Sequence, residues 1–226
     1  TNDYIVTNPV GTVGTGGNGG AAAYTGRIAT GQSFFVETRP AATSVVFDNS
    51  MRTVGTSTFF QAPTDFAKLW LRVNGNNNLS NETLIAFGDQ ATDGFDDIYD
   101  AKKIAASPDI ALYTTVGELN LAIQAMSALT SSRIIPVGFD VTSAGNFTFS
   151  ISNLEGFNPL ALVYLEDRHE GVLHNLRLSN YNVDLATATS GSERFFLHFI
   201  EPIEITSTSE TCNTNDGTIE LTSAPN

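Results

Sequence analysis

Residues 146–199 contain four short segments in which apolar and polar side chains alternate: NFTFSI (146–151), ALVYLED (161–167), NYNV (180–183) and RFFLHF (194–199). A period of two is typical of β-strands that bury one face. Turn residues separate the segments, and no helical periodicity lies between them. Strands at this spacing without intervening helices predict an antiparallel β-sandwich.

The preceding residues continue this pattern. Strands are predicted at 33–37, 44–47, 68–73, 83–87, 111–114 and 133–139. The segments 68–73 and 83–87 flank Asn74-Gly75, a pair that readily adopts positive φ, so they predict a hairpin with a long tip. Residues 119–129 also fit a short helix by propensity. The alternation of Leu121, Ile123 and Ala125 with their neighbours favours a strand.

These segments predict an all-β, jelly-roll or immunoglobulin-like sandwich. A seam near Ser131-Ser132 divides it into two packed sub-sandwiches, residues 1–130 and residues 131–205. Residues 206–226 form a Thr/Ser-rich run that resumes a strand-like pattern at 218–221 and predicts a linker followed by the start of another unit.

The chain is strongly acidic. Its 226 residues include 11 Lys and Arg against 24 Asp and Glu, a formal net charge of −13. Such a surface repels phosphate backbones and anionic lipids, which argues against nucleic-acid binding and membrane docking. Few charged residues and many Thr and Asn residues favour a secreted bacterial surface protein over a cytosolic enzyme. The single cysteine, Cys212, is expected to pair with a cysteine beyond Asn226.

Several strings occur together in order: YIVTNP (4–9), IATGQSFFV (28–36), VFDNSMR (46–52), LWL (69–71), DGFDDIYDAKK (93–103), LEDR (165–168) and RFFLHF (194–199). Together they resemble a module near the C-terminus of large type IX-secreted cell-surface proteins of Bacteroidota. The tail from Cys212 to Ile219 resembles the opening of immunoglobulin-like repeats in gliding-motility adhesins of that phylum. The resemblance implies a β-sandwich, extracellular localisation at the cell surface, and an adhesive or anchoring role. It also implies that Glu166-Asp167 ends a core strand and that Asp167 supports the following turn.

The strongest local feature is an acidic loop with five carboxylates in twelve residues, and its members are Asp89, Asp93, Asp96, Asp97 and Asp100. Their spacing partly matches an EF-hand loop, whose oxygen ligands suit Ca²⁺. Position 3 is Ala91 and position 12 is Asp rather than Glu, so the motif is incomplete. The alternative is a solvated loop whose carboxylates cap turns and pair with basic side chains. The sequence predicts one cofactor, a Ca²⁺ ion bound by the carboxylates of this acidic loop.

Other motifs favour structural roles. The glycines Gly14, Gly16 and Gly19 match a dinucleotide fingerprint but lack its strand and helix, so they predict a surface loop. His169 and His174 flank Gly171 in a predicted hairpin turn, where a surface role is favoured over catalysis or zinc binding. Five aromatic residues could form a platform for sugar rings, although a buried Trp70 is favoured; they are Trp70, Tyr99, Tyr113, Tyr164 and Tyr181.

The sequence therefore predicts a non-catalytic extracellular module of a large, multidomain surface protein, acting in adhesion, gliding or filament building. Its expected partners are neighbouring domains of the same polypeptide and a surface polysaccharide or other adhesion ligand. The alternative function is a carbohydrate-binding module of a secreted polysaccharide-degrading enzyme. A catalytic domain is disfavoured because the sequence offers no complete acid/base or nucleophile set.

Overall fold

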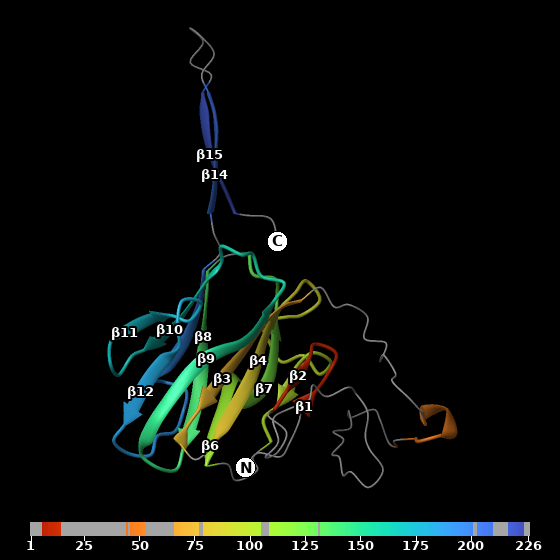
Figure 1. Cartoon of the computed structure of the whole chain (residues 1–226). Helices are drawn as coiled ribbons and strands as arrows, with labels where there is room; N and C mark the ends of the chain where they lie inside the picture. Colours follow the sequence, from red (N-terminus) through yellow and green to blue (C-terminus); the bar gives the residue numbers. More distant parts are fainter. Residues whose placement is uncertain are drawn as a thin grey trace.

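The alternating segments form the strands of the computed structural model (Figure 1). The structure describes residues 6–14, 44, 46–52, 66–76, 79–104, 109–130, 132–200, 203–209 and 217–223. Within these ranges, the helical segment is the short 3₁₀ turn η2 (Asn49–Met51), and no helix is long and apolar enough to cross a membrane. The strands are β1 (Val6–Thr7), β2 (Thr12–Val13), β3 (Ala67–Asn74), β4 (Ser80–Phe87), β5 (Ala101–Lys102), β6 (Ile110–Val116), β7 (Leu119–Met126), β8 (Arg133–Val141), β9 (Gly145–Glu155), β10 (Leu162–Asp167), β11 (Val172–Asn175), β12 (Tyr181–Leu185), β13 (Phe195–Ile200), β14 (Ile203–Thr208) and β15 (Thr218–Ser223).

Eleven of these strands form one large sheet. Its order is β11-β10-β13-β8-β6-β7-β4-β3-β9-β12, with β5 paired to β7 beside this path. The sheet curls until it is nearly a barrel, which confirms the predicted all-β fold. The two layers of the predicted sandwich are opposite walls of this single curled sheet. Among the described strands, β4 and β7 pair in parallel, whereas the other neighbours are antiparallel.

Two local predictions are confirmed. Strands β3 and β4 pair from Ala67 opposite Phe87 to Asn74 opposite Ser80, so they form the expected hairpin. Its tip is closed by the backbone N–H of Gly75, which donates to the carbonyl of Leu79 at 2.8 Å. The ambiguous segment at 119–129 contains strand β7 rather than a helix.

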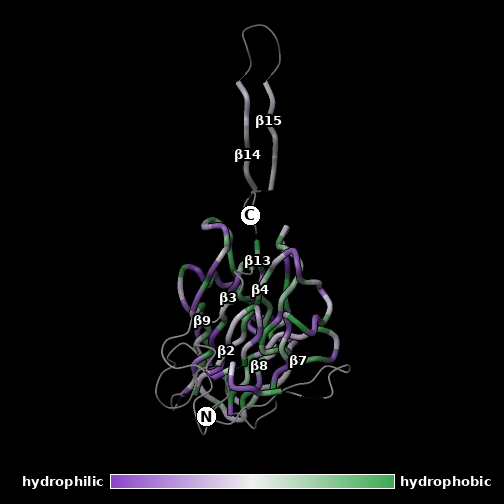
Figure 2. The backbone as a smooth tube through the Cα atoms, turned by 90° about the vertical axis from the view of Figure 1, so that its right-hand side faces the viewer, coloured by the Kyte–Doolittle hydropathy of each residue, from purple (hydrophilic) through white to green (hydrophobic). Residues whose placement is uncertain are grey.

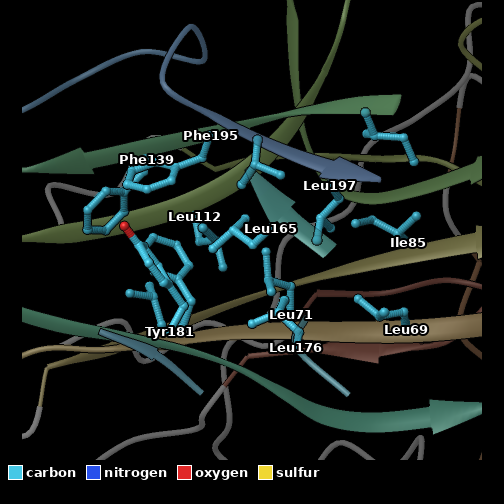
Figure 3. Packing of buried hydrophobic residues seen from close by; sticks show 14 of the residues in the cluster. Leu69, Leu71, Ile85, Leu112, Phe139, Leu165, Leu176, Tyr181, Phe195 and Leu197 are labelled. Atoms are coloured by element: carbon cyan, nitrogen blue, oxygen red, sulfur yellow. The ribbon is translucent and has the colours of Figure 1, made fainter. Parts of the chain in front are cut away.

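Apolar side chains fill the interior of the curled sheet. Phe139 contacts three neighbouring rings, those of Phe147, Phe149 and Phe195, at centroid distances of 5.3, 5.1 and 5.7 Å. Figure 3 shows part of this core, where residues of β8 and β13 face Leu69 and Leu71 of β3. Figure 2 shows hydrophobic and hydrophilic positions interleaved through the body of the sheet, as period-two strands require.

A second apolar cluster covers the outside of β4. Ile85 and Phe87 of this strand point into the main core, while Leu84 and Ala86 pack with Val10 and Val13 of the N-terminal segment. Strand β4 is therefore buried on both faces, which is typical of a strand with a parallel neighbour. Trp70 is partly buried against this second cluster, and its indole N–H donates to the carbonyl of Thr12 at 2.8 Å.

The predicted boundary near Ser131-Ser132 falls inside the large sheet. Strand β6 precedes this point and pairs with β8 after it, and β3 likewise pairs with β9. The strands of residues 67–126 thus form the middle of one sheet, and those of residues 133–200 flank them on both sides. Strands β14 and β15 pair with each other in a separate two-stranded sheet, which Figure 1 shows apart from the barrel.

One predicted strand is wrong. Ser44, Val46 and Phe47 are irregular rather than extended into a sheet, and the two apolar side chains are exposed. The reason is local, because the next residue, Asp48, caps the η2 turn by accepting a hydrogen bond from the Ser50 N–H at 2.7 Å. Three other predictions fall outside the described residues, namely the strand at 33–37, the loop at Gly16 and Gly19, and the pairing of Cys212.

Candidate binding pocket at one end of the barrel

A pocket of about 860 Å³ opens where β10, β12 and β13 meet their connecting loops. Its apolar part is formed by Phe139, Leu185 and Phe195, which belong to the main core. The polar part comes from the β10–β11 turn and from the loop between β12 and β13. We call it the barrel-end pocket, and its polar and small lining residues are Arg168, His169, Glu170, Asp184, Ala186, Thr187, Thr189, Ser190, Gly191, Ser192, Glu193 and Arg194.

The loop from β12 to β13 is fastened to β8. Thr189 and Val141 exchange two backbone hydrogen bonds, and the N–H of Phe139 donates to the carbonyl of Gly191 at 3.0 Å. The carboxylate of Asp140 also accepts from the Ser190 hydroxyl at 2.7 Å and from the Gly191 N–H at 2.9 Å. These bonds give the pocket a fixed wall of hydroxyl-bearing residues.

The β10–β11 turn is held by Asp167, which is fully buried. Its Oδ1 accepts hydrogen bonds from the backbone N–H groups of His169 and Glu170, at 3.0 and 3.3 Å. Its two oxygens also accept hydrogen bonds from Nε and Nη2 of Arg194, at 2.9 and 2.7 Å. Oδ2 accepts a further hydrogen bond from the Tyr181 hydroxyl at 3.0 Å. The implied role of Asp167 in supporting the turn is thereby confirmed.

Opposing effects act on this carboxylate. Burial alone raises the pKa of Asp167, but hydrogen bonds from Arg194, Glu170 and Tyr181 outweigh burial and hold it below its ordinary value. Burial and the neighbouring carboxylate raise the pKa of Tyr181 to about 12. Asp167 is therefore an anionic anchor for the arginine.

A second charged group lies on the outer face of the same strands. The guanidinium of Arg168 stacks 3.4 Å from the centroid of the Phe196 ring and lies 3.3 Å from Glu166. The other oxygen of Glu166 lies 2.8 Å from the imidazole of His198. The hydrogen bond with His198, followed by the Arg168 interaction, lowers the pKa of Glu166.

The structure separates the three histidines. His169 is exposed beside Glu170 in the predicted turn, His174 contacts the backbone of Ser179, and His198 lies on β13. The described residues contain no group of three or more His, Cys, Asp or Glu side chains arranged to hold a metal ion. The five aromatic residues that were the alternative sugar platform are likewise dispersed, because Tyr113 and Tyr181 are buried.

The acidic loop uses several carboxylates as acceptors for protein groups. Asp93 accepts from the Ser127 hydroxyl at 2.7 Å and from Arg133 at 2.6 Å, which lowers its pKa. Asp96 accepts from the Thr92 N–H at 2.6 Å. Asp89 and Asp97 are exposed. The carboxylates at 93 and 96 therefore cap and pair as the solvated-loop alternative expects, and calcium binding stays a prediction.

Asp100 is the buried member of this loop. One of its oxygens accepts from the Asp96 N–H at 2.8 Å and the other from the Ala125 N–H at 2.7 Å. Burial outweighs these two bonds and raises the pKa of Asp100 to about 6. Its geometry ties the loop to strand β7.

Sequence reasoning missed Arg194, Asp140 and the loop at 189–192 as parts of a pocket. Arg194 is the first residue of a predicted strand segment, but its partner Asp167 lies 27 residues away. Gly191 adopts φ +110°, a conformation that favours glycine, and Ser-Gly-Ser at 190–192 was an available turn signal.

Comparison with known proteins gives one family match. The family DUF8693, described as a domain of unknown function, matches residues 1–199. No curated protein and no solved structure matches the chain.

Proposed function

Because the chain belongs to the family DUF8693, whose description assigns no function, we propose its role from its own geometry. It acts as a non-catalytic binding module of a large extracellular protein at the bacterial cell surface, in adhesion, gliding or filament building. The barrel-end pocket is its ligand-contacting site.

The observation that carries this proposal is the rigidity of the pocket wall. Asp167 holds Arg194 and the β10–β11 turn, while Asp140 holds Ser190 and Gly191. Polar groups fixed before binding lose little conformational entropy when a ligand arrives. Such preorganisation suits recognition of a polar ligand at the mouth of a barrel.

The pairing of the polar groups supports binding rather than catalysis. The Ser190 hydroxyl donates to Asp140, and His169 pairs with Glu170 at the exposed turn. A serine nucleophile needs a general base within hydrogen-bonding reach that is itself oriented by a third group. Here the serine contacts a carboxylate that already accepts two further hydrogen bonds, from Tyr113 and Gly191.

The position at which the large sheet ends supports the proposal that this sheet is one unit of a multidomain chain. The family match ends at residue 199, and the last strand of the large sheet, β13, ends at Ile200. The following β14–β15 hairpin forms its own small sheet. This agrees with the prediction that residues 206–226 lead into another unit, and neighbouring domains of the same polypeptide are the proposed partners.

A carbohydrate-binding module is the second candidate. Arginine, carboxylate and hydroxyl groups surround an apolar floor in the pocket, which is the mixture that sugar hydroxyls and ring faces need. On the outer face, Tyr164 and Phe196 are partly exposed near the Arg168 stack. A surface polysaccharide could be the ligand of either an adhesive module or a carbohydrate-binding module.

Binding of the whole chain to a glycan array and to whole bacterial surfaces tests the proposal. We expect one ligand class whose affinity falls at least about tenfold, or 1.4 kcal/mol, when Asp184 and Glu193 are both changed to alanine. The matched control is Glu118→Ala, an exposed carboxylate in the β6–β7 turn, which should not change binding. Equal binding by both variants would exclude the pocket as the site.

A further inference from the structure

Lys103 and Asn81 meet near the start of strand β4 in the large sheet. The Nζ atom of Lys103 lies 2.6 Å from Oδ1 of Asn81. Asn81 is only 5% exposed and sits on β4 opposite Val73. The backbone N–H of Lys103 donates to the carbonyl of Asn120 at 2.7 Å, so the lysine is fixed beside β7. An amine and a carboxamide are thus held together by two anchored segments.

A second donor acts on the same amide oxygen. The backbone N–H of Leu112 on β6 donates to Oδ1 of Asn81 at 2.9 Å. This bond identifies the atom facing both donors as oxygen, because a carboxamide nitrogen cannot accept them. It also withdraws electron density from the carbonyl carbon and would stabilise negative charge on the oxygen, as oxyanion-hole donors do.

The amine is poised to lose its proton. Burial lowers the pKa of Lys103 to about 8, and the charge of Asp140 offsets part of this effect. Asp140 lies across the β6–β8 pair from Ala111, next to Leu112 in the chain. A neutral amine in contact with a polarised amide is the arrangement that acyl transfer to nitrogen requires.

We propose that the Lys103 side chain and the Asn81 side chain join in an intramolecular isopeptide bond, which cross-links the segment after β5 to strand β4. The Nζ lone pair attacks Cγ of Asn81, and Oδ1 takes up negative charge against the Leu112 N–H. The Cγ–Nδ2 bond then breaks, and Nδ2 takes the proton released by Nζ and leaves as ammonia. One amine and one primary amide become one secondary amide and ammonia, without any oxidant or co-reactant.

The cross-link would close a covalent loop from residue 81 to residue 103. This loop contains all five carboxylates of the acidic loop, whose mutual repulsion opposes folding. Closing it restricts the unfolded chain and resists opening of β4 and β5 by force or proteases. Resistance to force would suit a module exposed at the cell surface, although the bond itself does not depend on the proposed function.

Mass spectrometry of the full chain tests the bond directly. We expect the intact mass to be lower than the sequence mass by one ammonia molecule. Trypsin should release a branched peptide that joins residues 73–102 to residues 103–133 through Lys103, without cleavage after that lysine. A sequence mass with separate peptides would overturn the proposal. Ammonia loss confined to the single peptide 73–102 would also overturn it, because that product is a succinimide within the peptide, for which Asn74-Gly75 is the most reactive site, and not a cross-link.

Two variants sharpen the test. Lys103→Arg keeps the positive charge but should abolish the ammonia loss and lower the melting temperature by about 5 °C or more. The matched control, Lys102→Arg, alters the neighbouring exposed lysine, whose amine lies over the Phe95 ring, and should keep the cross-link. Loss of the branched peptide in the control as well would contradict the assignment to Lys103.

Discussion

Asp167 and Arg194 form a two-point ion pair, in which Nε and Nη2 of the arginine donate to separate carboxylate oxygens at 2.9 and 2.7 Å. The aspartate is fully buried, and the arginine side chain is 18% exposed. Although 27 residues separate them, the pair joins the end of β10 to the start of β13. It fixes both the turn and the loop that line the barrel-end pocket.

Replacing the arginine should destabilise the fold strongly. Arg194→Met leaves the Asp167 charge buried without its main partner, and we expect a loss of about 3–5 kcal/mol in the free energy of unfolding. Urea unfolding measures this loss. The control Arg168→Met removes an exposed pair with Glu166 and should cost at most about 1 kcal/mol. Equal losses would mean that the buried pair contributes no special stability.

A close approach between Tyr113 and Gly138 gives a second prediction. A Cβ atom added to Gly138 would lie 1.9 Å from the Tyr113 ring, so the ring packs directly on the glycine backbone. Gly138→Ala should therefore cost about 1–3 kcal/mol through overpacking. In a double-mutant cycle, Tyr113→Ala should remove most of that cost, as thermal or urea unfolding would show. Additive losses would contradict direct contact.

The pKa of Asp100 predicts an unusual pH dependence. Because burial raises this pKa from 3.8 to about 6, the folded state binds more protons than the unfolded state between these values. The stabilisation that Asp100 contributes to the folded state is fully present below about pH 4 and is lost as the pH rises through about 6. At 1.36 kcal/mol per unit, the change is at most about 3 kcal/mol.

Comparison with Asp100→Asn isolates this contribution. The variant should be less stable at pH 4, because one of the Asp96 and Ala125 N–H groups would face an amide nitrogen. The difference in the free energy of unfolding between wild type and variant should become smaller from pH 4 to pH 7. Parallel stability curves across this range would show that Asp100 titrates normally.

The sequence predicted those features that depend on neighbouring residues. Alternation and the Asn74-Gly75 pair indicate the β3–β4 hairpin because its strands are adjacent in the chain. The parallel β4–β7 contact joins strands separated by the acidic loop and β6, and no local pattern specifies such a pairing. The single curled sheet in place of two sheets follows from this long-range contact.

The barrel-end pocket could not be predicted, because it is formed by residues that lie still farther apart in the sequence. Asp140 and Gly191 lie 51 residues apart, and only the folded sheet brings their hydrogen-bonding atoms together. The acidic loop, by contrast, is obvious in the sequence because its residues are clustered. Clustering shows that carboxylates are near one another but not which groups they face, and Asp93 and Asp100 face protein donors.

Calcium binding by the acidic loop remains a testable prediction. At 100-fold excess over its Kd, Ca²⁺ bound only to the native state would add about 2.7 kcal/mol, so the melting temperature should exceed that in EDTA by several degrees. Asp97→Ala should erase this shift without changing the EDTA value, because Asp97 is exposed. Asp93→Ala should lower both values, since Asp93 holds Ser127 and Arg133. Identical wild-type curves in calcium and EDTA would leave only the solvated-loop role.

The separation of β14 and β15 from the large sheet predicts that the barrel folds without them. These strands pair with each other and with no strand of the large sheet among the described residues. An isolated two-stranded hairpin is marginally stable in water, so it contributes little to the barrel. A chain ending at Ile200 should therefore keep the melting temperature of the full chain within about 2 °C, which corresponds to less than about 1 kcal/mol.

The matched comparison is a chain ending at Gly191. It lacks β13, and with it the Arg194 partner of Asp167 and the core residues Phe195, Leu197 and Phe199, so it should fail to fold. Circular dichroism and thermal melts of the three chains separate these cases. Pairing within the large sheet is complete at β13, so removing residues 201–226 should leave its melting temperature almost unchanged. A fall of several degrees in the melting temperature after this truncation would instead show that the hairpin stabilises the barrel.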